Sequence, residues 1–206
     1  MPQSLQARIR SQSPVVNSKA RIALFGGTFD PVHEGHMHIA RLAHQQAQLD
    51  EVIFLPCQQS PHKSAHSQAS MDDRIAMLQL ATADEPWMRV DNYEATTSSP
   101  SYSYRTVVHF VEKNPDTDWF WLMGCDQWLA LPQWKHPDIL ASHLTFLVFS
   151  RIETPQPREG YRMQHLLGDH PASATALRDP KSAHHLHADW LSPAVLEYIH
   201  SNGLYR

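Results

Sequence analysis

The sequence is poor in cysteine, in long apolar runs and in excess charge, and each shortage excludes a class of protein. Its 206 residues include only two cysteines, Cys57 and Cys125, which we expect to be buried, reduced thiols of a cytoplasmic protein, with a lone disulfide as the alternative. No run of about 18 apolar residues occurs that could span a membrane. The net charge of −4 argues against a protein that binds duplex nucleic acid or a membrane surface.

The first 20 residues differ in composition from the rest of the chain. They are polar and basic, and they lack the continuous apolar segment of a secretory signal. We interpret them as a flexible tail. No internal repeat or linker divides the remaining residues, and their number suffices for one domain with a buried core. The sequence therefore predicts a tail over residues 1–20 and a single domain over residues 21–206.

Short apolar runs alternate along the chain with segments of helical periodicity. Strands are expected at residues 21–25, 51–56, 88–93, 118–124 and 143–150. Helices are expected from residue 36 and at residues 71–83, 104–113 and 137–141, with Ile75, Leu78 and Leu80 facing the core. Continuously apolar strands that alternate with helices are typical of a parallel sheet covered on both faces. The expected fold is therefore α/β, a Rossmann-like doubly wound parallel sheet with a small C-terminal helical segment.

The residues that end or follow the expected strands indicate where a ligand would bind. Gly26 and Gly27 follow the first strand, Pro56 ends the second, Gly124 ends the fourth and Arg151 follows the fifth. Ligands of open parallel sheets bind outside the carboxyl ends of the strands. The functional site is therefore expected at this edge of the sheet.

The segment FGGTFDPVHEGHMHIA, residues 25–40, joins the first expected strand to the first expected helix. Gly26 and Gly27 let the backbone approach a ligand closely, and the following helix N-terminus is a natural seat for phosphate. His33 and His36 flank a single glycine, so both imidazoles can face one anion. A metal site would favour i, i+4 spacing or nearby acidic ligands, and a purely structural turn is the third alternative. The pattern favours contact with phosphate.

The fifteen histidines also raise the question of a metal site. His184, His185 and His187 form a cluster, but carboxylate or thiolate partners at ligand spacing are lacking. We therefore expect no metal site made by protein side chains.

The motif GGTFDPVHEGH resembles the signature of the HxGH nucleotidyltransferase superfamily. Later segments are similar to motifs of the bacterial nicotinate mononucleotide adenylyltransferases. These segments are SPHK at residues 60–63, RIAML at 74–78, DNYEATTSSPSYSYRT at 91–106, WLMGCDQWLALPQW at 121–134, SATALR at 173–178 and LSPAVLEYIHSNGLY at 191–205. The resemblance thus covers residues 21–206 in order.

The resemblance implies a nucleotidyltransferase fold and a defined reaction. The phosphate of nicotinate mononucleotide would attack the α-phosphorus of ATP, giving deamido-NAD and pyrophosphate in NAD biosynthesis. Positioning and electrostatics would carry the catalysis, and Mg²⁺ would be bound with ATP. Two alternatives stay open: nicotinamide mononucleotide as the preferred substrate, and a nucleotide-binding paralogue without turnover. The expected partners are the two nucleotides, with no nucleic acid and no membrane, and the sequence leaves homo-oligomerisation open.

The same resemblance assigns roles to individual residues. The catalytic residues, which would contact the ATP phosphates, are His33, His36, Lys63 and Arg178. The other ATP-binding residues would be Gly26, Gly27, Thr28, Phe29, Gly124, Asp126, Ser173 and Thr175, of which Ser173 and Thr175 would also cap a helix start. The mononucleotide would contact Ser98, Tyr102 and Trp134, with the indole stacked on the pyridine ring. The alternatives are a solvated surface lysine for Lys63 and a core tryptophan for Trp134.

Three features depart from the family pattern, all near SATALR. Residues 162–172 are poor in strand formers where an apolar strand would be expected. Pro180 follows Arg178 closely and should block a regular helix there. The run SAHHLHADW, residues 182–190, replaces a regular helical turn and loop. These departures concern the part of the site that would bind the triphosphate.

Overall fold

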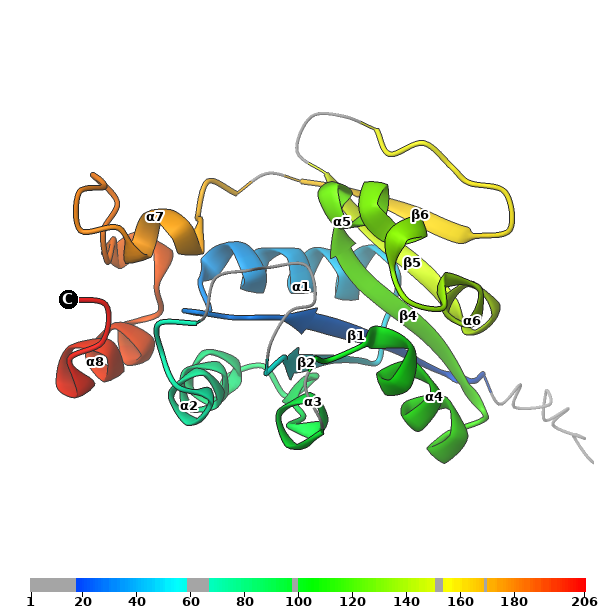
Figure 1. Cartoon of the computed structure of the whole chain (residues 1–206), viewed down its shortest axis with the longest axis horizontal. Helices are drawn as coiled ribbons and strands as arrows, with labels where there is room; N and C mark the ends of the chain where they lie inside the picture. Colours follow the sequence, from blue (N-terminus) through cyan, green and yellow to red (C-terminus); the bar gives the residue numbers. More distant parts are fainter. Residues whose placement is uncertain (1–17, 59–66, 98–99, 151–153, 169) are drawn as a thin grey trace, which may run out of the picture.

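The structure is a computed structural model that describes residues 18–58, 67–97, 100–150, 154–168 and 170–206. Within these residues the core is a six-stranded sheet in the order β3-β2-β1-β4-β5-β6 (Figure 1). All neighbouring strands are parallel. The strands are β1 (Ala20–Gly27), β2 (Glu51–Pro56), β3 (Met88–Val90), β4 (Thr117–Gly124), β5 (Leu144–Ser150) and β6 (Arg162–Leu167).

The strand order reverses next to β1. The chain runs outward from β1 through β2 to β3, then returns to the other side of β1 and continues from β4 to β6. A ligand crevice forms at such a switch point, outside the carboxyl ends of the two diverging strands. In register, Gly27 lies beside Pro56, and Gly124 lies beside Phe149. The expected doubly wound parallel sheet is therefore confirmed.

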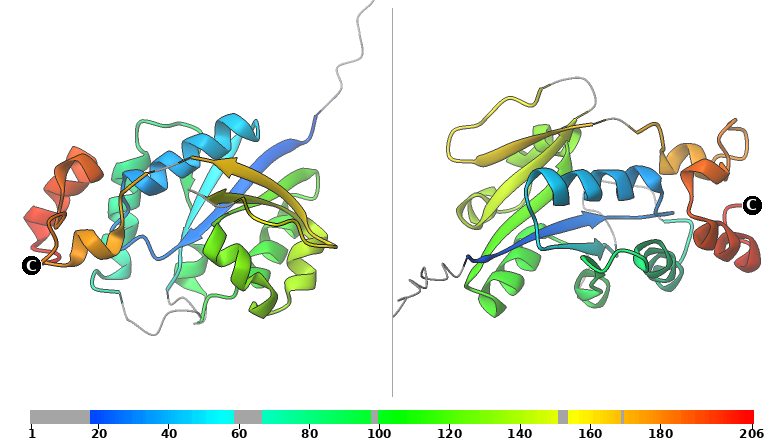
Figure 2. Two further views of the ribbon diagram at one scale, coloured as in Figure 1. Left: turned by 90° about the horizontal axis from the view of Figure 1, so that it is seen from above. Right: turned by 180° about the vertical axis from the view of Figure 1, so that it is seen from behind.

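Helices cover both faces of the sheet (Figure 2). One face packs against α1 (Glu34–Gln46), α2 (Met71–Thr82) and α8 (Pro193–Asn202). The other packs against α4 (Ser103–Lys113), α5 (Cys125–Ala130), the 3-10 turn η1 (Leu131–Gln133) and α6 (Pro137–His143). Successive residues of β1 alternate between the two clusters, with Ala23 in one and Leu24 in the other. Because both faces are buried, the strands read as continuous apolar runs.

The remaining helices are short. α3 (Tyr93–Thr96) lies where the sequence predicted the end of a longer third strand, so the prediction of a strand over residues 88–93 was wrong beyond Val90. α7 (Ala174–Arg178) ends two residues before Pro180. This end was expected, because proline has no backbone N–H to donate within a helix. With η2 (Ala188–Trp190) and α8 it forms the expected C-terminal helical segment, at the left of Figure 1.

Residues 162–167 form β6, although their composition argued against a strand. β6 pairs with β5 along its whole length, and it lies at the edge of the sheet. Leu166 is fully buried, whereas Leu167 is 64% exposed. An edge strand that buries little of its surface does not need the continuous apolar run of a central strand, which is why its composition was misleading.

Two predictions of burial were also wrong. Leu80 is 39% exposed, because α2 turns Met77 and Leu78 toward the sheet and leaves Leu80 on its outer side. Cys57 is buried as expected, but Cys125, in the first turn of α5, is only partly buried. Among the described residues, no helix is both long and apolar enough to cross a membrane.

Candidate active site

The loop between β1 and α1 lies at the switch point of the sheet. Phe29 in this loop has a left-handed backbone, with φ of 49°, and its buried ring contacts Phe25 and Phe54. A Cβ atom added to Gly27 would lie 2.8 Å from Cζ of Phe29. Only glycine therefore allows the strand end and the aromatic ring to approach this closely. The result is a tight loop between the strand and the helix.

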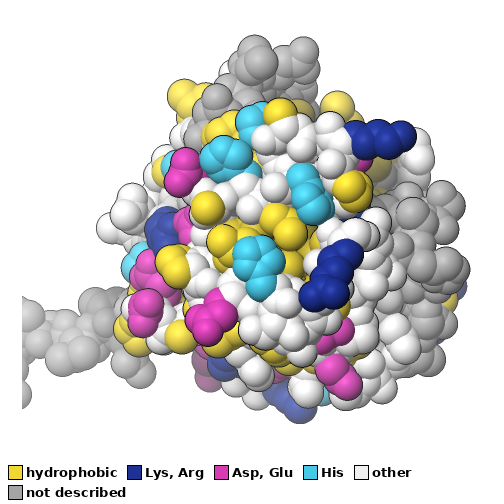
Figure 3. All heavy atoms as spheres, turned by 90° about the vertical axis from the view of Figure 1, so that its left-hand side faces the viewer, with side chains coloured by type: hydrophobic (Ala, Val, Ile, Leu, Met, Phe, Trp, Pro, Cys, Tyr) yellow, Lys and Arg dark blue, Asp and Glu magenta, His cyan; other side chains and the backbone are white. Residues whose placement is uncertain are grey.

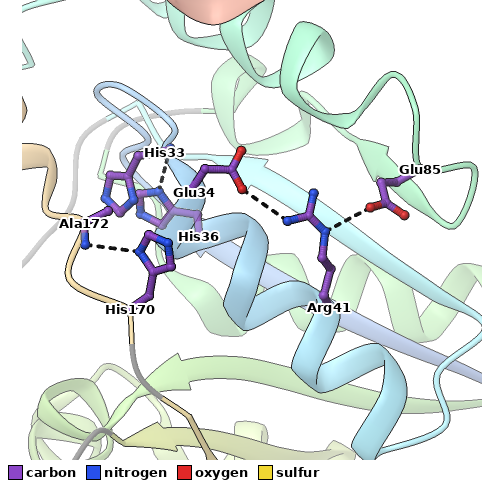
Figure 4. Close-up of polar contacts among 7 residues, drawn as sticks. All are labelled: His33, Glu34, His36, Arg41, Glu85, His170 and Ala172. Atoms are coloured by element: carbon purple, nitrogen blue, oxygen red, sulfur yellow. Dashed lines mark hydrogen bonds and ion pairs between the residues drawn. The ribbon is translucent and has the colours of Figure 1, made fainter. Parts of the chain in front are cut away.

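His33 and His36 lie together at the start of α1 (Figure 4). Their rings are stacked, with centroids 3.8 Å apart and an angle of 27° between the planes. The backbone N–H of His33 donates to Nδ1 of His36 over 3.3 Å. Because this nitrogen accepts, the neutral His36 ring carries its proton on Nε2. The two imidazoles are thus brought together, as the sequence predicted.

Gly35 leaves room for the His33 ring close to the helix start. A Cβ atom at Gly35 would lie 3.0 Å from both Cε1 and Nδ1 of His33. A larger residue would require that ring to shift by a few tenths of an ångström. Glu34, the other intervening residue, is turned away and pairs with Arg41 over 3.2 Å, and Arg41 also contacts Glu85 over 2.9 Å (Figure 4). The spacing of the motif therefore places His33 and His36 together, while the carboxylate of Glu34 is directed toward Arg41.

Asp30 holds the loop in place, and sequence reasoning missed it. Its buried carboxylate accepts hydrogen bonds from the backbone N–H groups of Gln68 and Ala69, over 2.8 and 3.1 Å. The hydroxyl of Tyr205 donates to the same carboxylate over 2.6 Å. Burial and the hydrogen bond to Asp30 raise the pKa of Tyr205 well above its usual range. The penultimate residue of the chain thus anchors the opening loop.

Arg74 is a second anchor that the sequence indicated only as part of a helical motif. Its side chain is buried in α2, and one guanidinium nitrogen donates to the carbonyl oxygens of Thr28 and Cys57, over 2.7 and 2.9 Å. It therefore joins the loop after β1 to the end of β2.

The triphosphate end of the predicted site contains Ser173, Thr175 and Arg178. Ser173 occupies the N-cap position of α7, but its side chain makes no hydrogen bond to the helix, so the predicted side-chain cap is wrong. Thr175 is exposed on the same short helix. Arg178 donates to the backbone carbonyl of Asp30, which brings this residue to the opening loop.

His170 lies in the segment that leads to this short helix. Its Nδ1 accepts a hydrogen bond from the backbone N–H of Ala172 over 3.2 Å (Figure 4). On the face formed by the carboxyl ends of the strands, histidine side chains gather around an apolar region (Figure 3). His184 and His187 belong to the turn after α7, where both rings contact Trp190. In the described part of the chain, no three His, Cys, Asp or Glu side chains form a cluster that could hold a metal ion.

Gly124 and Asp126 lie where β4 runs into α5. A Cβ atom at Gly124 would be 2.6 Å from Oδ1 of Asp126, so the carboxylate folds back over the strand end. Asp126 is exposed in the first turn of α5. Its carboxylate can therefore accept hydrogen bonds from the hydroxyls of a ligand at this edge.

The predicted mononucleotide end is lined by aromatic rings. Trp134 is partly buried and meets Trp121 edge to face, with centroids 6.2 Å apart. Trp121 in turn lies beneath Gly26, since a Cβ atom there would be 3.1 Å from its Cζ2. Tyr102 lies at the start of α4, with the ammonium of Lys135 4.7 Å from its ring centroid. Two of the predicted residues, Lys63 and Ser98, lie outside the described residues.

Glu94 is a further buried group that sequence reasoning missed. Its carboxylate accepts a hydrogen bond from the hydroxyl of Thr106 over 2.7 Å, and its backbone carbonyl accepts one from Ser101 over 3.4 Å. Burial raises the pKa of Glu94 to about 7, although the Thr106 bond acts in the opposite direction. The residue was visible in the sequence only as the acidic position of the motif at residues 91–106.

We expect Tyr205→Phe to lower the free energy of unfolding by about 1–3 kcal/mol, because a buried carboxylate loses one of its donors. Urea unfolding of both proteins measures this. Tyr198→Phe is the matched control, since its hydroxyl donates to the less buried Asp73 over 2.9 Å. An equal loss in the two variants would show that Asp30 is no special anchor.

Comparison with known proteins agrees with this architecture. The cytidylyltransferase-like family model matches residues 24–180. A probable nicotinate-nucleotide adenylyltransferase of Neisseria gonorrhoeae is 36% identical over 200 residues, covering 90% of this chain and 98% of that protein. One from Methylacidiphilum infernorum is 34% identical over 191 residues, covering 90% and 92%.

Solved structures share the fold. The nicotinic acid mononucleotide adenylyltransferase of Plasmodium falciparum, complexed with NaAD, superposes with a TM-score of 0.72 over 90% of this chain and 97% of that one. Its sequence identity is 15%, so this likeness concerns the fold alone. With the family model and the curated relatives, the conclusion is direct. The chain belongs to the nicotinate-nucleotide adenylyltransferase family of cytidylyltransferase-like nucleotidyltransferases.

Proposed function

We propose that this protein transfers the adenylyl group of ATP to the phosphate of nicotinate mononucleotide, forming deamido-NAD and releasing pyrophosphate in NAD biosynthesis. The observation that carries the proposal is the stacked pair of His33 and His36 at the start of α1, at the switch point of the sheet. Arg178 comes to the same loop from the far end of the chain. Membership of the family supplies the reaction that this arrangement serves.

The chemistry needs two anions in line and stabilisation of a leaving group. A phosphate oxygen of the mononucleotide attacks the α-phosphorus of ATP, and the bond from that phosphorus to the bridging oxygen breaks as pyrophosphate departs. No protein nucleophile takes part, so the residues act by positioning and by donating hydrogen bonds where negative charge grows. His36 would donate through Nε2, and the N-terminus of α1 adds backbone N–H groups and the positive end of a helix dipole.

The other predicted residues take the remaining parts of the two nucleotides. The backbone from Gly26 to Phe29 would hold ATP, with Gly124 and Asp126 at its ribose. Ser173, Thr175 and Arg178 would contact the β- and γ-phosphates together with Lys63. Trp134, Tyr102 and Ser98 would bind the pyridine mononucleotide. Mg²⁺ would enter with ATP, bound by phosphate oxygens and water, because Mg²⁺ prefers oxygen ligands and keeps several waters.

One assay tests the function. Purified protein with ATP and Mg²⁺ is given nicotinate mononucleotide or nicotinamide mononucleotide, and pyrophosphate release is followed. We expect turnover with nicotinate mononucleotide. Turnover with neither substrate would contradict the proposal that the protein catalyses adenylyl transfer. Faster turnover with the amide would contradict nicotinate mononucleotide as the proposed substrate.

A further inference from the structure

Two cationic side chains from separate segments lie beside Tyr102. The ammonium of Lys135 is 4.7 Å from the centroid of the Tyr102 ring, and the guanidinium carbon of Arg105 is 5.5 Å from it. Lys135 belongs to the connection between η1 and α6, whereas Arg105 belongs to α4. Tyr102 is one of the three residues that the family pattern places against the mononucleotide. The two charges therefore lie at the pyridine end of the proposed site.

The backbone fixes the approach of Lys135. His136, the next residue, has a left-handed conformation with φ of 53° and ψ of 57°, and it occupies the N-cap position of α6. Its ring packs edge-on against Tyr104, with centroids 4.6 Å apart. A non-glycine residue in this conformation is held there by its surroundings. The turn thus keeps Lys135 beside the start of α4, although Lys135 itself is exposed.

The charged groups around Lys135 and Tyr102 bear on whether an anion can bind there. The first turn of α4 has no acidic residue. In the described part of the chain, no ion pair joins Lys135 to a carboxylate. Arg105 donates a hydrogen bond to the hydroxyl of Tyr104 over 3.2 Å, whereas the ammonium of Lys135 lies over the face of the Tyr102 ring. Both charged side chains at the Tyr102 ring are therefore cationic, in a chain of net charge −4, and the first turn of α6 carries one carboxylate, Asp138.

We propose that Lys135 selects the substrate whose pyridine ring carries a carboxylate over the one that carries a carboxamide. This inference rests on the proposed function. Carboxylate and carboxamide are nearly equal in shape, so a pocket cannot separate them by size and must use charge or hydrogen bonding. A flexible ammonium beside the ring attracts the carboxylate and gains little from the neutral amide. Lys135 is thus a specificity-determining residue.

The test compares kcat/KM for nicotinate mononucleotide and nicotinamide mononucleotide. In Lys135→Met we expect kcat/KM to fall about tenfold for the nicotinate substrate, which is the effect of removing one partly solvent-exposed charge near the carboxylate. For the amide we expect kcat/KM to change little. Lys135→Arg should keep the preference, because it keeps the charge. Lys113→Met is the matched control, since this exposed lysine lies at the opposite end of α4.

Each other outcome overturns the inference. An unchanged ratio of the two substrates in Lys135→Met would remove Lys135 from the choice. An equal fall in kcat/KM for both substrates would indicate that Lys135 contacts a group that the two substrates share, such as the phosphate. A wild-type preference for the amide would contradict the selection itself. Equilibrium binding of both mononucleotides to each variant gives the same comparison without turnover, so loss of the proposed reaction is distinguished from loss of the selectivity.

Discussion

Replacing His36 with alanine is expected to lower kcat by about 10²- to 10³-fold, the usual cost of removing one preorganised donor to a developing charge. The ring stacks on His33 and accepts a hydrogen bond through Nδ1, which leaves Nε2 as the proton-bearing nitrogen of the neutral ring. If His36 acts in the transition state, KM for ATP should change far less than kcat. Steady-state rates of pyrophosphate release measure both.

The control must separate catalysis from packing. The His36 ring also meets Phe29 edge to face, with centroids 5.0 Å apart, so alanine removes an aromatic contact as well as a donor. His36→Phe keeps a ring but no nitrogen, and we expect it to be as slow as the alanine variant. His200→Ala, at an exposed position in the last turn of α8, should keep normal rates. Near-normal turnover in His36→Phe would remove the imidazole from the chemistry.

The sequence predicted the central part of the fold well, because burial on both faces makes β1, β2, β4 and β5 continuous apolar runs. β6 escaped this reasoning because an edge strand obeys no such requirement. The loop with its two histidines was predicted from local spacing alone. The stacking of the rings, and the turning away of Glu34 toward Arg41, depend on side-chain packing that spacing does not specify.

The residues that hold the site together were harder to predict than those that line it. Asp30 and Tyr205 are 175 residues apart in the chain, yet their side chains are directly hydrogen-bonded. The family motifs contain both, in FDP and in the terminal LY, but a motif does not state which residue contacts which. Arg74 likewise marks a helix in the sequence and joins two loops in the structure. Such contacts follow from the topology, which brings distant segments to one edge.

Glu94 provides a test of this buried framework through pH. Its pKa of about 7 in the folded state lies above the ordinary value of 4.5, mainly because of burial. Below pH 4.5 the carboxyl group is protonated in both the folded and the unfolded state, so its burial carries no cost of ionisation. Between the two pKa values the unfolded chain binds fewer protons than the folded one, so stability falls as the pH rises. Above pH 7 the full loss remains, about 3 kcal/mol for this shift.

Glu94→Gln removes that ionisation while keeping the shape of the side chain and an acceptor for Thr106. We expect its stability relative to wild type to increase by about 2–3 kcal/mol between pH 5 and pH 8. Urea unfolding of both proteins at the two pH values gives the difference, and any fixed cost of the amide cancels between them. Glu112→Gln, at an exposed position on α4, should show no such change. If Glu94→Gln and wild type instead lose stability in parallel, then the carboxylate of Glu94 is already ionised at pH 5 in the folded protein, and the hydroxyl of Thr106 donates to a charged rather than a neutral carboxyl group.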